Sequence, residues 1–85
     1  RMLSEAEVKH LRWRCTHRAL REMDLLLGFF MERHFDGLDA EDRAAFAALA
    51  EMEDLDLWRL IAGRRECSDP ARARVLALLH DARPA

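Results

Sequence analysis

The chain has 85 residues, 51% of them apolar, and a formal net charge of −2. That length supports one domain with one modest core, and the apolar fraction is too high for a disordered chain. The net charge argues against a general polyanion binder, and no apolar run reaches the roughly 18 residues needed to cross a membrane, so no membrane insertion is expected.

The kind of apolar residue indicates the fold class. Alanine and leucine occur 14 times each, whereas the β-branched residues amount to two valines, one isoleucine and one threonine. Alanine and leucine lose little freedom in a helix, and strands favour β-branched side chains. The sequence therefore predicts an all-α protein, a single helical domain over residues 1–85. Arg1, ahead of Met2, is interpreted as a remnant of expression, and the start has no signal or transit pattern.

The first half of the chain contains two helix patterns with little between them. Ser4, followed three residues later by Glu7, forms a capping-box pattern that predicts a helix over residues 5–15. Thr16 is a candidate N-cap for a second helix over about residues 17–35, whose wide apolar stripe makes it the expected central helix. No Pro or Gly separates the two, so one long, kinked helix stays open as an alternative.

Two shorter helices are predicted next. The turn-prone pair Asp36-Gly37 ends the second helix, and Asp39 caps a third over about residues 40–52. Asp54 is the candidate N-cap of a fourth helix, which stops at Gly63.

The last helix begins at Asp69-Pro70, because proline suits the first helical position, and Pro84 closes the chain. About five short helices joined by short turns predict a compact bundle. The side chains expected in its core, whatever the function, are Leu20, Leu27, Phe30, Trp58 and Leu79.

Charge is unevenly distributed along the chain. Residues 1–21 hold six Lys or Arg against two acids, and residues 36–56 hold eight acids against one Arg. This division favours a protein partner with complementary patches, although solvated faces give the same pattern.

Metal binding and catalysis find little support in the sequence. Cys15 and His17 are the one local pair of soft ligands or of nucleophile and base, and residues two apart on a helix point in different directions. Cys15 and Cys67 need no disulfide, and a reduced compartment is expected. We expect no catalytic residue, no metal site and no tightly bound cofactor. A redox or metal protein that uses the two cysteines is one alternative hypothesis.

A basic N-terminal face supports another alternative hypothesis, a small helical nucleic-acid-binding or regulatory module. Glu22 and Asp24 follow this face at once and would repel phosphates, so no nucleic-acid partner is expected. The face would consist of Lys9, Arg12, Arg14, Arg18 and Arg21, with Trp13 among them.

Residues 18–24 break a local rule. If they open the second helix, Arg18 and Arg21 lie at the positive end of its dipole, where acids are preferred. A solvated charged face and a docking patch, in which guanidinium and carboxylate groups beside small Ala19 meet a partner, explain this equally well.

The stretch from Arg14 to Gly28 resembles the succinate dehydrogenase assembly factors that promote covalent FAD attachment. Their hallmark is Arg-Gly-x-x-Glu followed by a hydrophobic residue and often Asp. The resemblance continues through residues 38–41 and 54–58, so it covers nearly the whole chain, with Ala19 in place of the family's glycine. The residues that fit the hallmark are Arg18, Glu22, Met23 and Asp24.

The resemblance implies a helper protein without chemistry of its own. It would dock on the flavoprotein subunit of succinate dehydrogenase, or of fumarate reductase in bacteria, and hold FAD and an acceptor histidine of that subunit ready for attachment. Arg18 and Glu22 would reach into the partner, and Phe29 and Arg33, further along the helix, either extend the surface or are ordinary packed or solvated residues. The implied partner-binding residues are Arg18, Ala19, Arg21, Glu22 and Asp24.

The same resemblance sets the expected setting of the protein. The free protein is expected to be a monomer. Its expected compartment is the bacterial cytoplasm or, in a eukaryote, the mitochondrial matrix.

Overall fold

Helices form the regular structure of this protein. The computed structural model describes residues 2–63 and 67–83. No strand occurs among these residues, so the all-α prediction is confirmed. The elements are α1 (Glu5–Cys15), α2 (Arg21–Arg33), a short 3-10 turn η1 (Phe35–Gly37), α3 (Ala40–Ala50), α4 (Asp54–Ile61) and α5 (Pro70–Ala82).

Several helix boundaries follow from local sequence signals. The Ser4 hydroxyl accepts a hydrogen bond from the Glu7 N–H, and the Glu7 carboxylate accepts one from the Ser4 N–H, each at 3.1 Å. The carboxylates of Asp39 and Asp69 accept from backbone N–H groups in the first turns of α3 and α5. Gly63 follows α4 with a φ of +80°, a left-handed conformation that glycine adopts at little cost. These predicted boundaries are confirmed.

The second helix begins later than predicted. Residues 16–20 form an irregular link, called the α1–α2 junction below, and α2 starts at Arg21. The Thr16 hydroxyl donates to the carbonyl oxygens of Arg12 and Trp13 at 3.2 and 3.1 Å, at the end of α1. Threonine bonds backward to such carbonyls as well as capping forward. The prediction of a helix from residue 17 is therefore wrong, and α1 and α2 are not continuous.

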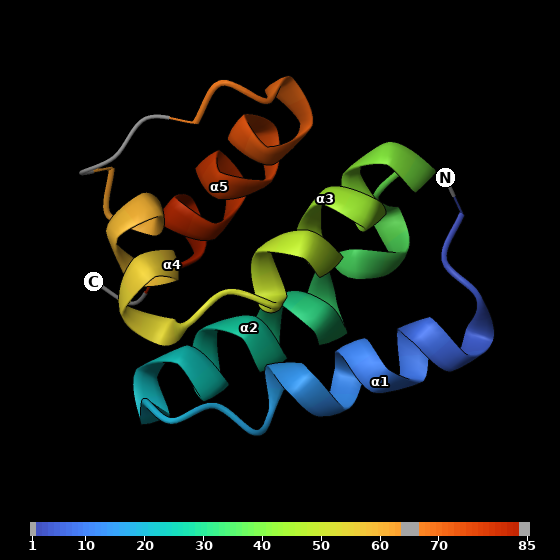
Figure 1. Ribbon diagram of the computed structural model, residues 1–85, viewed down its shortest axis with the longest axis horizontal. Coiled ribbons are helices and arrows are strands. Elements are labelled where there is room, and N and C mark those ends of the chain that lie inside the picture. Colours follow the sequence, from blue (N-terminus) through green and yellow to red (C-terminus); the bar gives the residue numbers. More distant parts are fainter. Residues whose placement is uncertain (1, 64–66, 84–85) are drawn as a thin grey trace.

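One hydrophobic core is shared by all five helices. In Figure 1, α3 lies between α1 and α5, and α2 packs against both α1 and α5. The apolar stripe of α2 faces this core, as expected for the central helix. Its buried residues are Met23, Leu26, Leu27, Phe30 and Met31.

The residues predicted to lie in the core differ in how deeply they are buried. Leu27, Phe30 and Leu79 are buried, which confirms their assignment. Trp58 is only partly buried and packs against the edge of the core. The assignment of Leu20 is wrong: it is 39% exposed, because it lies in the junction rather than on the inner face of a helix.

Cys15 is part of this core, at the end of α1. Burial raises the pKa of its thiol to about 12, although the charges of Arg18 and Arg12 act in the opposite direction. Cys67 is partly exposed ahead of α5, and both cysteines are free. Cys15 therefore behaves as a neutral apolar side chain at physiological pH.

Candidate functional site

The Arg18 side chain points into the protein from the α1–α2 junction. Its Nε donates to Oδ1 of Asp54 at 2.7 Å, and the two side chains of this ion pair are 2% and 9% exposed. Its terminal nitrogens donate to the carbonyl oxygens of Ala50 and Met52, the latter at 2.6 Å. One guanidinium thus joins the junction to the end of α3 and the start of α4.

The end of α3 explains why a buried cation is stable at this place. The last carbonyl groups of a helix lack N–H partners and carry partial negative charge. Arg14 also donates there, to the carbonyl oxygens of Ala50 at 3.3 Å and Glu51 at 3.4 Å. Asp54 is the first residue of α4, where the helix dipole favours an anion. Two successive helix ends therefore meet at one ion pair, and no buried side-chain polar atom in the described part of the chain lacks a partner.

Backbone hydrogen bonds hold the junction at two further points. The Leu20 N–H donates to Oδ2 of Asp54 at 2.8 Å, so both carboxylate oxygens of Asp54 bind the same segment. The Arg18 N–H donates to the carboxylate of Asp24, in the first turn of α2. Leu20 is the N-cap residue of α2 and makes no side-chain cap, so these contacts fix a helix start that its own sequence leaves uncapped.

The Asp54 carboxylate is stabilised in its charged form. Partial burial alone would raise its pKa. The hydrogen bonds from the Leu20 N–H and the Arg18 guanidinium, together with the charge of Arg18, outweigh this effect and hold the pKa below its ordinary value. Asp54 is therefore ionised at neutral pH.

The residues predicted to bind a partner divide into two groups. Arg18 and Asp24 make the inward contacts described above, so the expectation that Arg18 reaches outward does not match the position of its side chain. Ala19, Arg21 and Glu22 are exposed. Neither Arg21 nor Glu22 has a side-chain hydrogen bond or ion pair to any described residue. Their role in partner binding stays a prediction.

Ala19 lies in the junction rather than in a helix, so the helix propensity of alanine has no bearing on it. Among the described residues other than glycine, none has a positive φ. The backbone at this position therefore does not require glycine. In the folded protein the Ala19 methyl group is part of the exposed surface of the junction.

Asp54 is the site residue that the sequence assigned wrongly. The structure has Glu53 at the N-cap of α4, with no side-chain cap, and uses the Asp54 carboxylate for Arg18 and Leu20 instead. The sequence did indicate that a basic N-terminal segment could pair with an acidic middle segment. It could not identify Arg18 and Asp54 as the pair, because an acid at a helix start has the same sequence pattern whether it caps the helix or binds a distant arginine.

The basic N-terminal face is divided between the inside and the outside of the protein. Arg14 and Arg18 bind carbonyl oxygens at the end of α3 and are not free to bind phosphates. Trp13 remains 53% exposed and stacks on His17 with 4.2 Å between ring centroids. The nucleic-acid hypothesis therefore loses two of the cations on which it depends.

A groove, called the α2–α4–α5 groove below, opens beside Glu22. It encloses about 750 Å³, and its walls include Leu25 and Phe29 of α2, Trp58 of α4, and Arg83 at the end of α5. Leu25 is 61% exposed and Phe29 is 41% exposed. Apolar side chains left this open, next to a Glu22 carboxylate that pairs with no described residue, indicate a contact surface.

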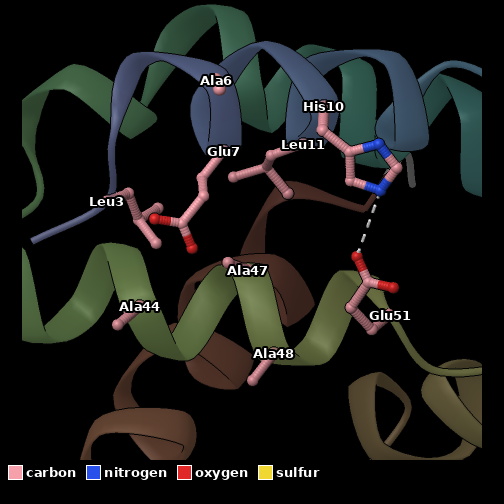
Figure 2. A pocket seen from close by; sticks show the side chains of 9 residues that line it. All are labelled: Leu3, Ala6, Glu7, His10, Leu11, Ala44, Ala47, Ala48 and Glu51. Atoms are coloured by element: carbon pink, nitrogen blue, oxygen red, sulfur yellow. Dashed lines mark ion pairs between the residues drawn. The ribbon is translucent and has the colours of Figure 1, made fainter. Parts of the chain in front are cut away.

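Another cleft, of about 600 Å³, lies between α1 and α3 (Figure 2). Ala44, Ala47 and Ala48 line its α3 side, and His10 on α1 faces Glu51 with 3.7 Å between Nε2 and Oε1. None of the predicted partner-binding residues lines this cleft. It carries no sign of a binding site beyond its shape.

Within residues 2–63 and 67–83, no group of three or more metal-binding side chains comes together. None of the described helices is long and apolar enough to cross a membrane.

Removing Arg18 should destabilise the protein far more than removing its exposed neighbour Arg21. Arg18→Ala strands a buried carboxylate and helix carbonyls, and breaking one half of a buried ion pair costs about 3–5 kcal/mol. Arg21→Ala should stay within about 0.5 kcal/mol of the unaltered protein. Urea unfolding followed by circular dichroism measures both. Equal stability of the two variants would contradict the structural role of Arg18.

The lowered pKa of Asp54 predicts a loss of stability in acid. The ion pair contributes fully above about pH 4, the ordinary pKa of the unfolded carboxyl, and is lost as the pH falls through the lower folded-state pKa. Asp54→Asn should therefore be less stable than the unaltered protein at neutral pH, and the difference should shrink in acid. Free energies of unfolding measured at several pH values test this, and a difference independent of pH would count against it.

Comparison with known proteins identifies the family of this chain. Residues 9–83 match the family described as flavinator of succinate dehydrogenase. The FAD assembly factor SdhE of Pseudomonas aeruginosa is 38% identical over 80 residues, which cover 94% of each chain. Proteins of the same name from Methylococcus capsulatus and Shewanella oneidensis are 35% and 33% identical over 69 residues, covering 81% of this chain and 82% and 83% of theirs.

The matched region takes in the junction, the Arg18–Asp54 ion pair and every predicted partner-binding residue. It also runs through most of α1 and the whole of α2 to α5. The chain therefore belongs to the flavinator of succinate dehydrogenase family.

Proposed function

We propose that this protein binds the flavoprotein subunit of succinate dehydrogenase and promotes covalent attachment of FAD to that subunit. Membership of the flavinator family and the names of its relatives support the assignment. The structural observation that carries it is the pair of exposed, unpaired charges Arg21 and Glu22, which stand beside a junction held rigidly from within. A surface ordered before binding loses little entropy when a partner docks.

The proposed mechanism is positioning rather than catalysis by the chain itself. Cys15 is buried and protonated, and so it offers no nucleophile. Docking would hold FAD and an acceptor histidine of the partner at reacting distance, and such alignment alone accelerates a reaction strongly. FAD belongs to the partner in this proposal and is not tightly bound by the helper.

The exposed and buried residues of the motif have different tasks in this proposal. Glu22 and Arg21 make charge-assisted hydrogen bonds to the partner, which are stronger than neutral ones. Arg18 acts as a positioning residue, because its contacts with Asp54 and α3 set the course of the junction. Ala19 lies between Arg18 and Arg21, at the surface that comes closest to the partner backbone.

The proposal extends to the setting of the protein. We place it in the cytoplasm of a bacterium, as a monomer when free, with the flavoprotein subunit of fumarate reductase as a second client. Sedimentation of the free protein and of its mixtures with each purified subunit tests the monomeric state and the binding of the second client.

Co-expression with the flavoprotein subunit tests the function directly. With the unaltered protein, flavin fluorescence should remain on the denatured subunit, and without it that signal should fall. Glu22→Ala and Arg21→Ala should lower the signal several-fold, because each removes a charged contact to the partner.

Matched controls for these variants lie elsewhere on the exposed surface. Glu32→Ala on α2 and Arg12→Ala on α1 remove an exposed charge of the same kind, and should leave the signal unchanged. Arg12→Ala also separates the proposal from one based on the basic N-terminal face. Undiminished flavin attachment with Glu22→Ala would show that the site is wrongly placed.

Ala19 offers a test of how closely the partner approaches. Ala19→Gly should keep or strengthen partner binding, since it removes a methyl group from the surface. It should also cost about 0.4–1 kcal/mol of stability, because glycine gives the unfolded chain more freedom. Binding constants and urea unfolding measure the two effects. A clear loss of binding would mean that the methyl group is part of the interface.

A further inference from the structure

We propose that the α2–α4–α5 groove is a second part of the partner interface. It takes an amphipathic segment of the flavoprotein that presents apolar side chains together with carboxylates. This inference rests on the proposed function, from which it takes the identity of the partner. The inference extends the proposed function in two ways. It gives a second place, beyond the junction, where the partner binds, and it gives the chemistry of the partner segment that binds there.

The groove is continuous with the junction surface through α2. Glu22 belongs to the predicted docking residues and also lines the groove. Leu25 lies three residues after Glu22, and Phe29 lies four residues after Leu25, which places all three side chains on one face of the helix. A partner that binds Glu22 therefore meets the groove next.

The groove offers a partner large apolar side chains that the core does not use. Leu25 and Phe29 are 61% and 41% exposed on the α2 wall. On α4, Leu55 is 61% exposed and lies one turn from Trp58, which lines the groove. Aromatic and leucine side chains gathered in this way supply most of the binding energy in protein interfaces when a partner covers them.

Away from Glu22, the rim of the groove is cationic, and this favours carboxylates in the part of the segment that lies there. The Arg33 guanidinium lies 5.3 Å from the centre of the Phe29 ring, and that of Arg83 lies 5.9 Å from the centre of the Trp58 ring. No carboxylate of the described residues forms an ion pair with either arginine. The Arg33 guanidinium makes no hydrogen bond to a described residue, so its N–H groups are free for a carboxylate. The Arg83 guanidinium donates to the carbonyl oxygen of His80 at 3.2 Å and lies 3.1 Å from its Nε2, so it offers its charge and its remaining N–H groups.

The charges along α2 also give the segment a direction. Glu22 and Arg33 lie eleven positions apart on α2, about 16 Å at the rise of an α-helix. A segment with a base near Glu22 and carboxylates near Arg33 and Arg83 fits this order, and the reverse orientation places like charges together. An apolar segment with carboxylates is therefore favoured over a second copy of this chain or a lipid surface.

Charged substitutions in the apolar wall test the proposal. Leu25→Glu and Phe29→Glu should each weaken binding to the flavoprotein subunit, measured by calorimetry, by about tenfold or more. Leu78→Glu is the matched control, since Leu78 is 43% exposed on α5 and does not line the groove. It should change the dissociation constant less than about twofold. Circular dichroism melts check that each variant folds, and Leu25→Glu, at the more exposed position, keeps the test valid if Phe29→Glu unfolds.

Charge reversal at the rim tests whether the partner segment carries carboxylates. Arg33→Glu and Arg83→Glu should weaken binding by about tenfold at low salt and by less at high salt, because screening removes the attraction that they lose. Lys9→Glu, an exposed charge reversal on α1, should have little effect.

The possible failures are distinguishable. If the groove variants bind normally while Glu22→Ala binds poorly, the groove inference is overturned and the proposed function stands. If the unaltered protein does not bind the subunit, both are overturned. If Leu25→Glu abolishes self-association of the free protein and leaves partner binding intact, the groove is an interface between two copies of this chain, and the inference is again wrong.

Discussion

The buried ion pair of Arg18 and Asp54 is the contact on which the proposed docking surface depends. A cation inside a protein is stable only when its donors are matched. Here the end of α3 supplies carbonyl oxygens and α4 supplies the carboxylate. In return, the link between α1 and α2 is held in place although it has no capping residue of its own. Ala19 and Glu22 are thereby left at the surface in a defined arrangement.

This geometry gives Arg18 and Glu22, the two charged residues of the Arg-x-x-x-Glu motif, different structural positions. Arg18 and Glu22 are four residues apart, but they are not helical neighbours, because α2 begins only at Arg21. The spacing instead separates a buried anchor from an exposed acid across an irregular link. In the proposed function, Arg18 therefore serves stability and Glu22 serves recognition, so the two tasks fall to different residues of one short motif.

Local signals were sufficient for much of the fold and insufficient for the site. Ser4 and Asp39 act on N–H groups within three residues, so their caps could be predicted from neighbouring positions alone. Arg18 and Asp54 lie 36 residues apart, and nothing in either neighbourhood identifies the other. Leu20 was misplaced for the same reason. Its spacing suits the inner face of a helix, but its N–H donates to a distant carboxylate instead.

That separation along the chain has a consequence for biosynthesis. The Arg18 segment leaves the ribosome well before Asp54, so the ion pair that holds the junction cannot form until Asp54 has been made. A nascent or truncated chain without α4 lacks the carboxylate that binds both Arg18 and Leu20. Under the proposed function, the partner would therefore bind only chains completed through α4, because shorter chains lack the ion pair that holds the proposed docking surface.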